Sequence, residues 1–190
     1  MMKIPVGISA RHIHLKKEDF TKIFGYDELT KLKDINQPHL FASEEVVDIK
    51  GNKSIIKNVR ILGPFRDYSQ VEISKTDAYN LGVNPLIRKS GRLNDTDFIT
   101  VVGPKGEISV PVIIANRHIH ISEEEANNLG IKDDDKTFVK INGEKRGIIE
   151  VYYKVSKEAY KELHLDLDDA NAFLLNQDDE VEIIEDNYDF

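Results

Sequence analysis

Short apolar runs separated by turn residues dominate the chain and predict many short strands. Gly-Pro-Lys-Gly at 103–106 and Asn-Gly-Glu-Lys at 142–145 interrupt the two longest runs and are typical of hairpin turns. The predicted β-rich segments are residues 46–55, 59–63, 98–115, 137–153 and 180–184. The chain is therefore expected to be mainly β.

Short helices are predicted between these strands. Ser74 begins one such segment and Gly82 ends it, and Ser122 and Gly130 bound a second. Each serine is followed three residues later by an acidic residue, as in an N-capping pattern. A third helix is predicted to begin at Ser156. Because the strands are short and the helices brief, the pattern favours small β-barrels over a βαβ parallel sheet.

One decapeptide occurs twice, as VGISARHIHL at 6–15 and VIIANRHIHI at 112–121. Each copy places Arg-His-Ile-His at the end of an apolar run. Side chains two positions apart on a strand share a face, so the two histidines of each copy can bind one ion. These pairs are His12 with His14 and His118 with His120. The repeat predicts two related barrel units and a dinuclear metalloenzyme.

Each histidine pair needs at least one further ligand. Two imidazoles on one face repel when protonated and bury polar nitrogens when neutral, unless a metal bridges them. His164, in HLDLDDANAF at the edge of the helix predicted from Ser156, is the obvious third ligand for one ion. Glu72 lies on one predicted strand face with Gln70 and is a candidate for the other ion. His39 is interpreted as an ordinary structural histidine.

Arginines flank the candidate ligands. Arg66 lies on a turn in GPFRDYSQVEIS, residues 63–74, and its planar fork of donors suits a phosphate or carboxylate. Arg11 and Arg117 each precede a histidine pair, which would bring an anion close to the metals. Strand alternation, however, turns both away from the imidazole face, so their role stays open.

Composition limits the class of protein. The chain has 190 residues, 40% of them apolar, which suits one domain or two small ones. Its formal net charge of −8 disfavours non-specific nucleic-acid binding. Without cysteine there is no disulfide, thiolate ligand or acyl-cysteine intermediate. No run approaches the roughly 18 apolar residues of a membrane helix, and no signal peptide is evident, so a cytoplasmic location is expected.

Four segments in order, RHIHL, GPFRDYSQVEIS, NRHIHIS and HLDLDDANA, resemble the PduL-type phosphotransacylases, or phosphate propanoyltransferases. The resemblance covers essentially the whole chain. It implies transfer of a short acyl group, acetyl or propanoyl, between phosphate and coenzyme A (CoA). It also implies two β-barrel domains, the first discontinuous over residues 1–10 and 116–190 and the second over 11–115.

The resemblance further implies two zinc ions per protomer, with CoA as co-substrate. One zinc would be held by His12, His14 and Glu72, and the other by His118, His120 and His164. Arg66 would bind phosphate as the catalytic residue, and a zinc-bound CoA thiolate would attack the acyl phosphate directly. The implied CoA contacts are Ile8, Ser9, Ala10, Lys53, Arg60 and Asn171. Partners would be small molecules, with no nucleic acid or membrane. The oligomeric state stays open, a homo-oligomer included. The N-terminal extension that targets some members to microcompartments is not evident.

Two other interpretations stay open at this stage. A dinuclear metal-dependent hydrolase would use the same ligands on a phosphate or amide substrate, and a zinc-stabilised barrel could be a non-enzymatic binding module. The His12–His14–Glu18 spacing of a cupin motif leaves the second histidine pair unexplained. An amidohydrolase barrel needs about 250 residues, more than this chain has.

Overall fold

The computed structural model describes residues 2–184. Met1 and residues 185–190, which belong to the predicted discontinuous domain, lie outside the described residues. The strands are β1 (Met2–Ser9), β2 (His12–His14), β3 (Lys31–Asp34), β4 (Phe41–Lys50), β5 (Ile55–Gly63), β6 (Gln70–Glu72), β7 (Leu86–Arg88), β8 (Phe98–Val102), β9 (Glu107–Ala115), β10 (His118–Ser122), β11 (Lys136–Ile141), β12 (Gly147–Ser156), β13 (Glu162–Asp166) and β14 (Glu180–Ile184). The helices are α1 (Lys17–Phe24), α2 (Lys75–Leu81), α3 (Glu123–Leu129) and α4 (Leu167–Phe173).

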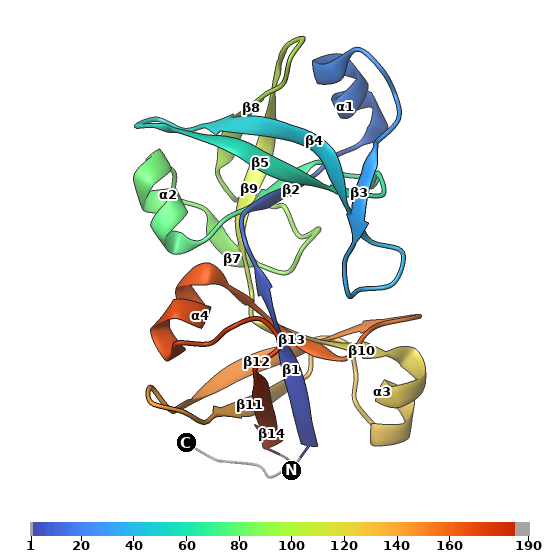
Figure 1. Ribbon diagram of the computed structural model, residues 1–190, viewed down its shortest axis with the longest axis vertical. Coiled ribbons are helices and arrows are strands. Elements are labelled where there is room, and N and C mark those ends of the chain that lie inside the picture. Colours follow the sequence, from blue (N-terminus) through green and yellow to red (C-terminus); the bar gives the residue numbers. More distant parts are fainter. Residues whose placement is uncertain (1, 185–190) are drawn as a thin grey trace. The chain divides into compact units, whose positions relative to one another are not determined.

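The described chain divides into two compact units. Unit 1 consists of residues 2–9 and 116–184, and unit 2 of residues 10–115. In unit 1 six strands close into a barrel in the order β1-β13-β10-β12-β11-β14. Figure 1 shows the N-terminal strand β1, in blue, between β13 and β14 at the red end of the sequence. Its core is aliphatic and includes Ile4, Ile119, Val139 and Leu163.

Unit 2 contains a second ring of six strands. Hydrogen-bonded pairing runs β4-β5-β2-β6-β9-β8 and returns from β8 to β4. β3 and β7 add to this sheet by pairing with β4 and β9. The interior is filled by Ile13, Ile49, Ile61 and Val112, and α1 contributes Phe20. The predicted mainly β fold with two β-barrels is therefore confirmed.

The two barrels share one strand topology. Each His-x-His strand, β2 or β10, has a parallel neighbour (β5 or β12) and an antiparallel neighbour (β6 or β13). The next strand around each ring is again parallel, β9 beside β6 and β1 beside β13. Because β1 leads into β2 while β9 leads into β10, each repeated decapeptide starts in one unit and ends in the other.

Of the three helices predicted to begin at a serine, two are confirmed. Ser74 and Ser122 are the N-caps of α2 and α3, where their side chains accept hydrogen bonds from the third following amides, and Gly82 and Gly130 end these helices in the left-handed conformation. The helix predicted from Ser156 is wrong. Ser156 is the last residue of β12, paired with Ser122 of β10. The backbone at the end of β12 pairs with β10 in the barrel instead of starting a helix.

One strand boundary and the position of His164 also differ from the prediction. Residues 46–55 are not one strand, because a turn at residues 51–54 separates β4 from β5. His164 lies within β13 rather than at a helix edge. Within residues 2–184, no helix combines the length and the apolar character needed to cross a membrane.

Candidate metal centres

The first candidate centre lies in unit 2 where two antiparallel strands place their side chains on one face. His12 is directly opposite Glu72, and His14 is opposite Gln70. The Nε2 atom of His12 is 3.5 Å from one Glu72 carboxylate oxygen, and the Nε2 atom of His14 is 3.9 Å from the other. All three residues are buried. Their ligand atoms lie within 4.8 Å of one another, so this group can hold one metal ion.

Backbone carbonyls fix the orientation of both imidazoles. The Nδ1 atom of His12 is 2.9 Å from the carbonyl oxygen of Ala10, and that of His14 is 3.2 Å from the carbonyl oxygen of Leu62. A hydrogen on Nδ1 can donate to these oxygens, which leaves the Nε2 lone pair for a metal. Burial lowers the pKa of His14 well below its usual value, with further lowering by His12 and Arg66, so His14 stays neutral at neutral pH.

The second candidate centre occupies the equivalent position in unit 1. His118 of β10 is opposite His164 of β13, and His120 is opposite Glu162. His118 Nε2 and His120 Nε2 are 3.2 Å apart, and His120 Nε2 and His164 Nδ1 are 3.3 Å apart. Nitrogens bound to one tetrahedral zinc ion at about 2.0–2.1 Å lie roughly 3.3–3.4 Å apart. Both distances therefore fit a zinc site, and the ligand atoms of all three histidines lie within 4.8 Å of one another.

Arg66 is held beside the first centre. Its backbone amide donates to the carbonyl of Leu15, and its Nη1 donates to the Tyr68 hydroxyl at 2.6 Å and to Ser90 Oγ at 3.2 Å. Within residues 2–184 both side-chain hydrogen bonds of Arg66 use Nη1, which leaves the Nε and Nη2 donors for an anion. The positive charge of Arg66 contributes to the lowered pKa of His14.

A hydrogen-bond network links Arg66 to the Glu72 carboxylate. Ser90 Oγ accepts from Gln70 Nε2 at 2.6 Å as well as from Arg66. Gln70 Nε2 also donates to Glu72, and Gln70 Oε1 accepts from the amide of Gly91 at 2.8 Å. Sequence reasoning missed Tyr68 and Ser90. Ser90 lies 20 residues from Gln70, and nothing in the local pattern connects them.

Arg11 and Arg117 have an equivalent structural role. Arg11 forms two hydrogen bonds of 2.8 Å with the Asp77 carboxylate, and Arg117 forms two with Asp169 at 2.9 and 2.6 Å. These hydrogen bonds raise the pKa of both arginines. Arg11, which precedes His12, is thereby attached to α2, the helix after Glu72. Arg117, which precedes His118, is attached to α4, the helix after His164. The Nε and Nη2 donors of both arginines are used for this attachment, so the structure assigns them a role that the sequence left open.

The six residues expected to contact CoA are distributed over both units. Ile8, Ser9 and Asn171 belong to unit 1, and Ala10, Lys53 and Arg60 belong to unit 2. Arg60 is opposite His12 on the neighbouring strand, and its Nη1 donates to the carbonyls of Ser43 and Glu44 at 2.9 Å each. The amide of Ile8 donates to Gln177 Oε1 at 2.9 Å. The Lys53 ammonium lies 4.8 Å from the centre of the Tyr79 ring.

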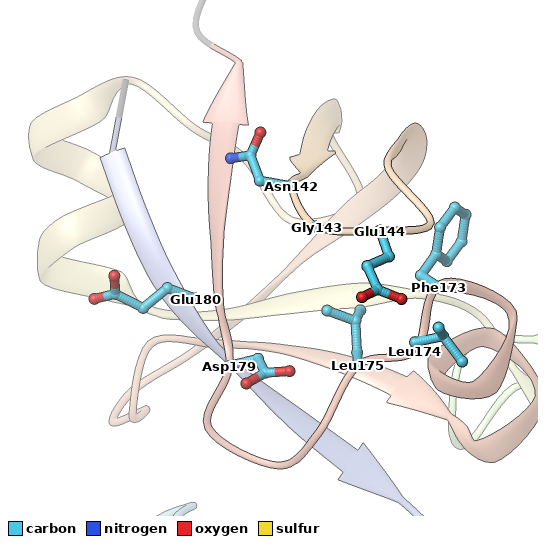
Figure 2. A pocket seen from close by; sticks show the side chains of 8 residues that line it. All are labelled: Asn142, Gly143, Glu144, Phe173, Leu174, Leu175, Asp179 and Glu180. Atoms are coloured by element: carbon cyan, nitrogen blue, oxygen red, sulfur yellow. The ribbon is translucent and has the colours of Figure 1, made fainter.

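A separate cavity of about 470 Å³ lies in unit 1 (Figure 2). None of the six expected CoA contacts lines it. Its lining combines Phe173 and the two following leucines with the carboxylates of Glu144, Asp179 and Glu180. Glu180 forms an ion pair with Lys3 at 3.1 Å, and the carboxylates of Glu144 and Asp179 would repel the phosphate groups of a nucleotide. This cavity is therefore not a candidate for the CoA site.

Sequence comparison finds similar proteins over most of the chain. The family model described as phosphate propanoyltransferase matches residues 5–176. A phosphate propanoyltransferase of Thermotoga maritima is 45% identical over 187 residues, covering 96% of this chain and 89% of the relative. Those of Lachnoclostridium phytofermentans and Salmonella typhimurium are 47% and 43% identical, each covering 89% of this chain and 81% and 82% of the relative.

Proposed function

Because this chain belongs to the phosphate propanoyltransferase family and is therefore an acyltransferase, we propose that it transfers a short acyl group, acetyl or propanoyl, between orthophosphate and CoA. The observation that carries the proposal is the hydrogen-bond network that connects Arg66 through Ser90 and Gln70 to Glu72 of the buried His12–His14–Glu72 group. A cation with free planar donors next to a metal-binding group suits a phosphate-bearing substrate.

We propose two zinc ions per protomer, one at each candidate centre. Both ligand sets consist of imidazole and carboxylate groups, which zinc accepts. When bound, zinc lowers the pKa of a coordinated thiol, so that the CoA sulfur is a thiolate, and it draws charge from nearby oxygens. His12, His14 and Glu72 would leave a coordination position for the sulfur. His118, His120 and His164 would hold the second ion.

In the proposed reaction the CoA thiolate attacks the carbonyl carbon of the acyl phosphate. The bond between that carbon and the phosphate oxygen breaks, giving acyl-CoA and orthophosphate. Arg66 binds the phosphate through Nε and Nη2 and stabilises the negative charge that accumulates on it as the bond breaks. Tyr68 and Ser90 hold the guanidinium in place through Nη1. The chain has no cysteine, so an acyl-cysteine intermediate cannot form. This fits direct transfer of the acyl group to CoA.

We further propose that CoA is bound by Ile8, Ser9, Ala10, Lys53, Arg60 and Asn171. Lys53 and Arg60 supply positive charge for its phosphate groups. In the position opposite His12, Arg60 would lie near the sulfur-binding centre. Ile8 and Ser9 form the end of β1, directly before the first histidine pair.

The decisive experiment measures consumption of acetyl, propanoyl and butanoyl phosphate by the metal-loaded protein with and without CoA. A phosphotransacylase consumes the acyl phosphate only with CoA and forms one acyl-CoA per phosphate released. CoA-independent release of phosphate would instead indicate a metal-dependent hydrolase. If no donor were consumed under either condition, while the metals still stabilised the fold, the chain would be a binding module.

A further inference from the structure

The third candidate ligand is a carboxylate, Glu72, in the first centre and an imidazole, His164, in the second. Four histidines of the pairs extend from β2 and β10, whereas His164 comes from β13 with its Nδ1 atom facing His120. The Nε2 atom of His164 faces the Glu162 carboxylate at 2.8 Å. An imidazole that donates its Nε2 hydrogen to a carboxylate has its lone pair on Nδ1. This arrangement predicts that His164 binds metal through Nδ1.

Glu162 is placed to fix this orientation. It is only 2% exposed and lies two residues before His164 on the same strand, opposite His120. A buried carboxylate needs hydrogen-bond donors, and the His164 ring supplies one. A carboxylate behind a metal-bound imidazole also makes the imidazole a stronger ligand.

Gly7 provides the space for the ring. It is opposite His164 on the neighbouring parallel strand. A Cβ atom at Gly7 would lie 2.7 Å from His164 Cδ2 and 2.9 Å from Glu162 Oε2, closer than real Cβ contacts. The His164–Glu162 pair can therefore occupy its position only beside glycine.

Unit 2 offers an internal comparison. There Glu72 takes the position of His164, Gln70 that of Glu162, and Ile113 that of Gly7. A carboxylate ligand supplies the negative charge itself and needs no second carboxylate behind it. Its smaller head group also tolerates isoleucine on the neighbouring strand.

We propose that Glu162 is a positioning residue of the second metal centre, which holds His164 with Nδ1 toward the ion while Gly7 gives the ring room. This inference rests on the proposed metal centre of His118, His120 and His164. In the second centre all three ligands are histidines, so the negative charge comes from Glu162, which contacts His164. In the first centre the negative charge is on the ligand Glu72 itself.

The first test is zinc affinity, measured by competition with a chromophoric chelator. Glu162→Gln preserves the side-chain size and copies the Gln70 of unit 2, so the variant should fold. We expect affinity for one of two zinc equivalents to fall roughly 10–100-fold, the usual effect of losing such a partner, with the other unchanged. Glu180→Gln, which changes an exposed glutamate of the same unit, should retain both affinities. Wild-type affinities in Glu162→Gln would overturn the proposal.

The second test identifies the ligand atom. Long-range ¹H–¹⁵N correlations of the zinc-loaded protein should show zinc on Nδ1 of His164, and on Nε2 of His12, His14 and His118. Zinc on Nε2 of His164 would overturn the assignment, since Glu162 would then have no ring hydrogen to accept.

Gly7→Ala is an independent variant, because it displaces the ring without changing any charge. It should weaken the same zinc equivalent, whereas Gly106→Ala, at a position with space for a Cβ atom, should not. Unchanged zinc binding in Gly7→Ala would contradict the role of Gly7. A wild-type protein in which no zinc is bound by His118, His120 or His164 would refute the second centre itself, an outcome separate from failure of the Glu162 assignment.

Discussion

Four histidines of the two centres have one ring nitrogen within hydrogen-bond distance of a protein oxygen. In His12, His14 and His118 the Nδ1 atom faces a backbone carbonyl, at 2.9, 3.2 and 2.8 Å. His164 uses Glu162 for the same purpose. In a neutral imidazole this arrangement places the lone pair on the nitrogen that faces the other candidate ligands, which would reduce the reorganisation needed to bind an ion.

Glu72 is predicted to be essential for the first metal ion. Glu72→Gln keeps the shape of the side chain but removes the charge that attracts a divalent ion. We expect loss of one metal equivalent and of most activity, measured by metal analysis and the CoA-dependent assay. Glu107→Gln, at an exposed position of the same unit, is the control. If the Glu72 variant kept both ions and normal turnover, Glu72 would not be a ligand.

Arg66 is predicted to bind phosphate rather than CoA. Lysine at this position keeps the charge but lacks the two parallel donors. Arg66→Lys should therefore fold and bind metal normally, while its affinity for acyl phosphate falls by about 1.5–3 kcal/mol, the contribution of a charged hydrogen bond. Steady-state kinetics with each substrate varied in turn measures this effect. Lost CoA affinity with intact phosphate affinity would reverse the assignment.

At the level of elements, the arginine–aspartate pairs connect each His-x-His strand to a helix. Asp77 is 3% exposed and lies in the first turn of α2, whose N-cap Ser74 follows Glu72 by two residues. Arg11 precedes β2 directly. The pair therefore ties β2, which carries His12 and His14, to the helix that follows Glu72. Arg117 with Asp169 ties β10 to α4, the helix that follows His164, in the same way.

Removing this connection is predicted to destabilise unit 2. Asp77→Asn leaves the Arg11 charge without its partner, so we expect the free energy of unfolding to fall by about 1.5–3 kcal/mol, as for a hydrogen bond to a charged group. Chemical denaturation measures the loss. Asp27→Asn, which breaks an exposed ion pair with Lys17, should have little effect because solvent screens it. Equal stability of the two variants would argue against a structural role for the pair.

At the level of the whole molecule, the two barrels have separate hydrophobic cores. The buried cluster of unit 2 and that of unit 1 share no residue. Ile49 and Ile141 are fully buried, one in each cluster. Because truncating a buried isoleucine leaves a cavity, Ile49→Ala and Ile141→Ala should each cost about 2–5 kcal/mol. Native-state hydrogen exchange should show lost protection in the altered barrel, and equal loss in both barrels would contradict separate cores.

Metal removal is predicted to affect the whole molecule at once. The purified chain should contain two metal ions per protomer, most often zinc, and chelation should abolish activity. Because a ligand that binds only the folded state stabilises it, chelation should also lower the melting temperature, and added zinc should restore both properties. Metal analysis that returned one ion or none in active protein would refute the two-centre model.

Local sequence determined the parts of this protein that depend on neighbouring residues. Apolar runs interrupted by turn residues predicted the hairpins of β8 with β9 and of β11 with β12, and capping serines predicted α2 and α3. The repeated His-x-His pairs indicated where the candidate ligands lie, because a strand places alternate side chains on one face. The ligand roles, the CoA contacts, the cytoplasmic location and the oligomeric state stay predictions.

Only the tertiary structure decided which residues meet across long sequence separations. It replaced a predicted helix after Ser156 with barrel pairing, and it brought Ser90 to Arg66 and Asp77 to Arg11. It also paired β1 with the C-terminal strands β13 and β14, an arrangement that the family resemblance implied but that no local pattern predicted. These contacts arise from the closure of two rings of strands, which satisfies backbone hydrogen bonds and buries apolar faces over the whole chain. That requirement is global, so no local pattern records it.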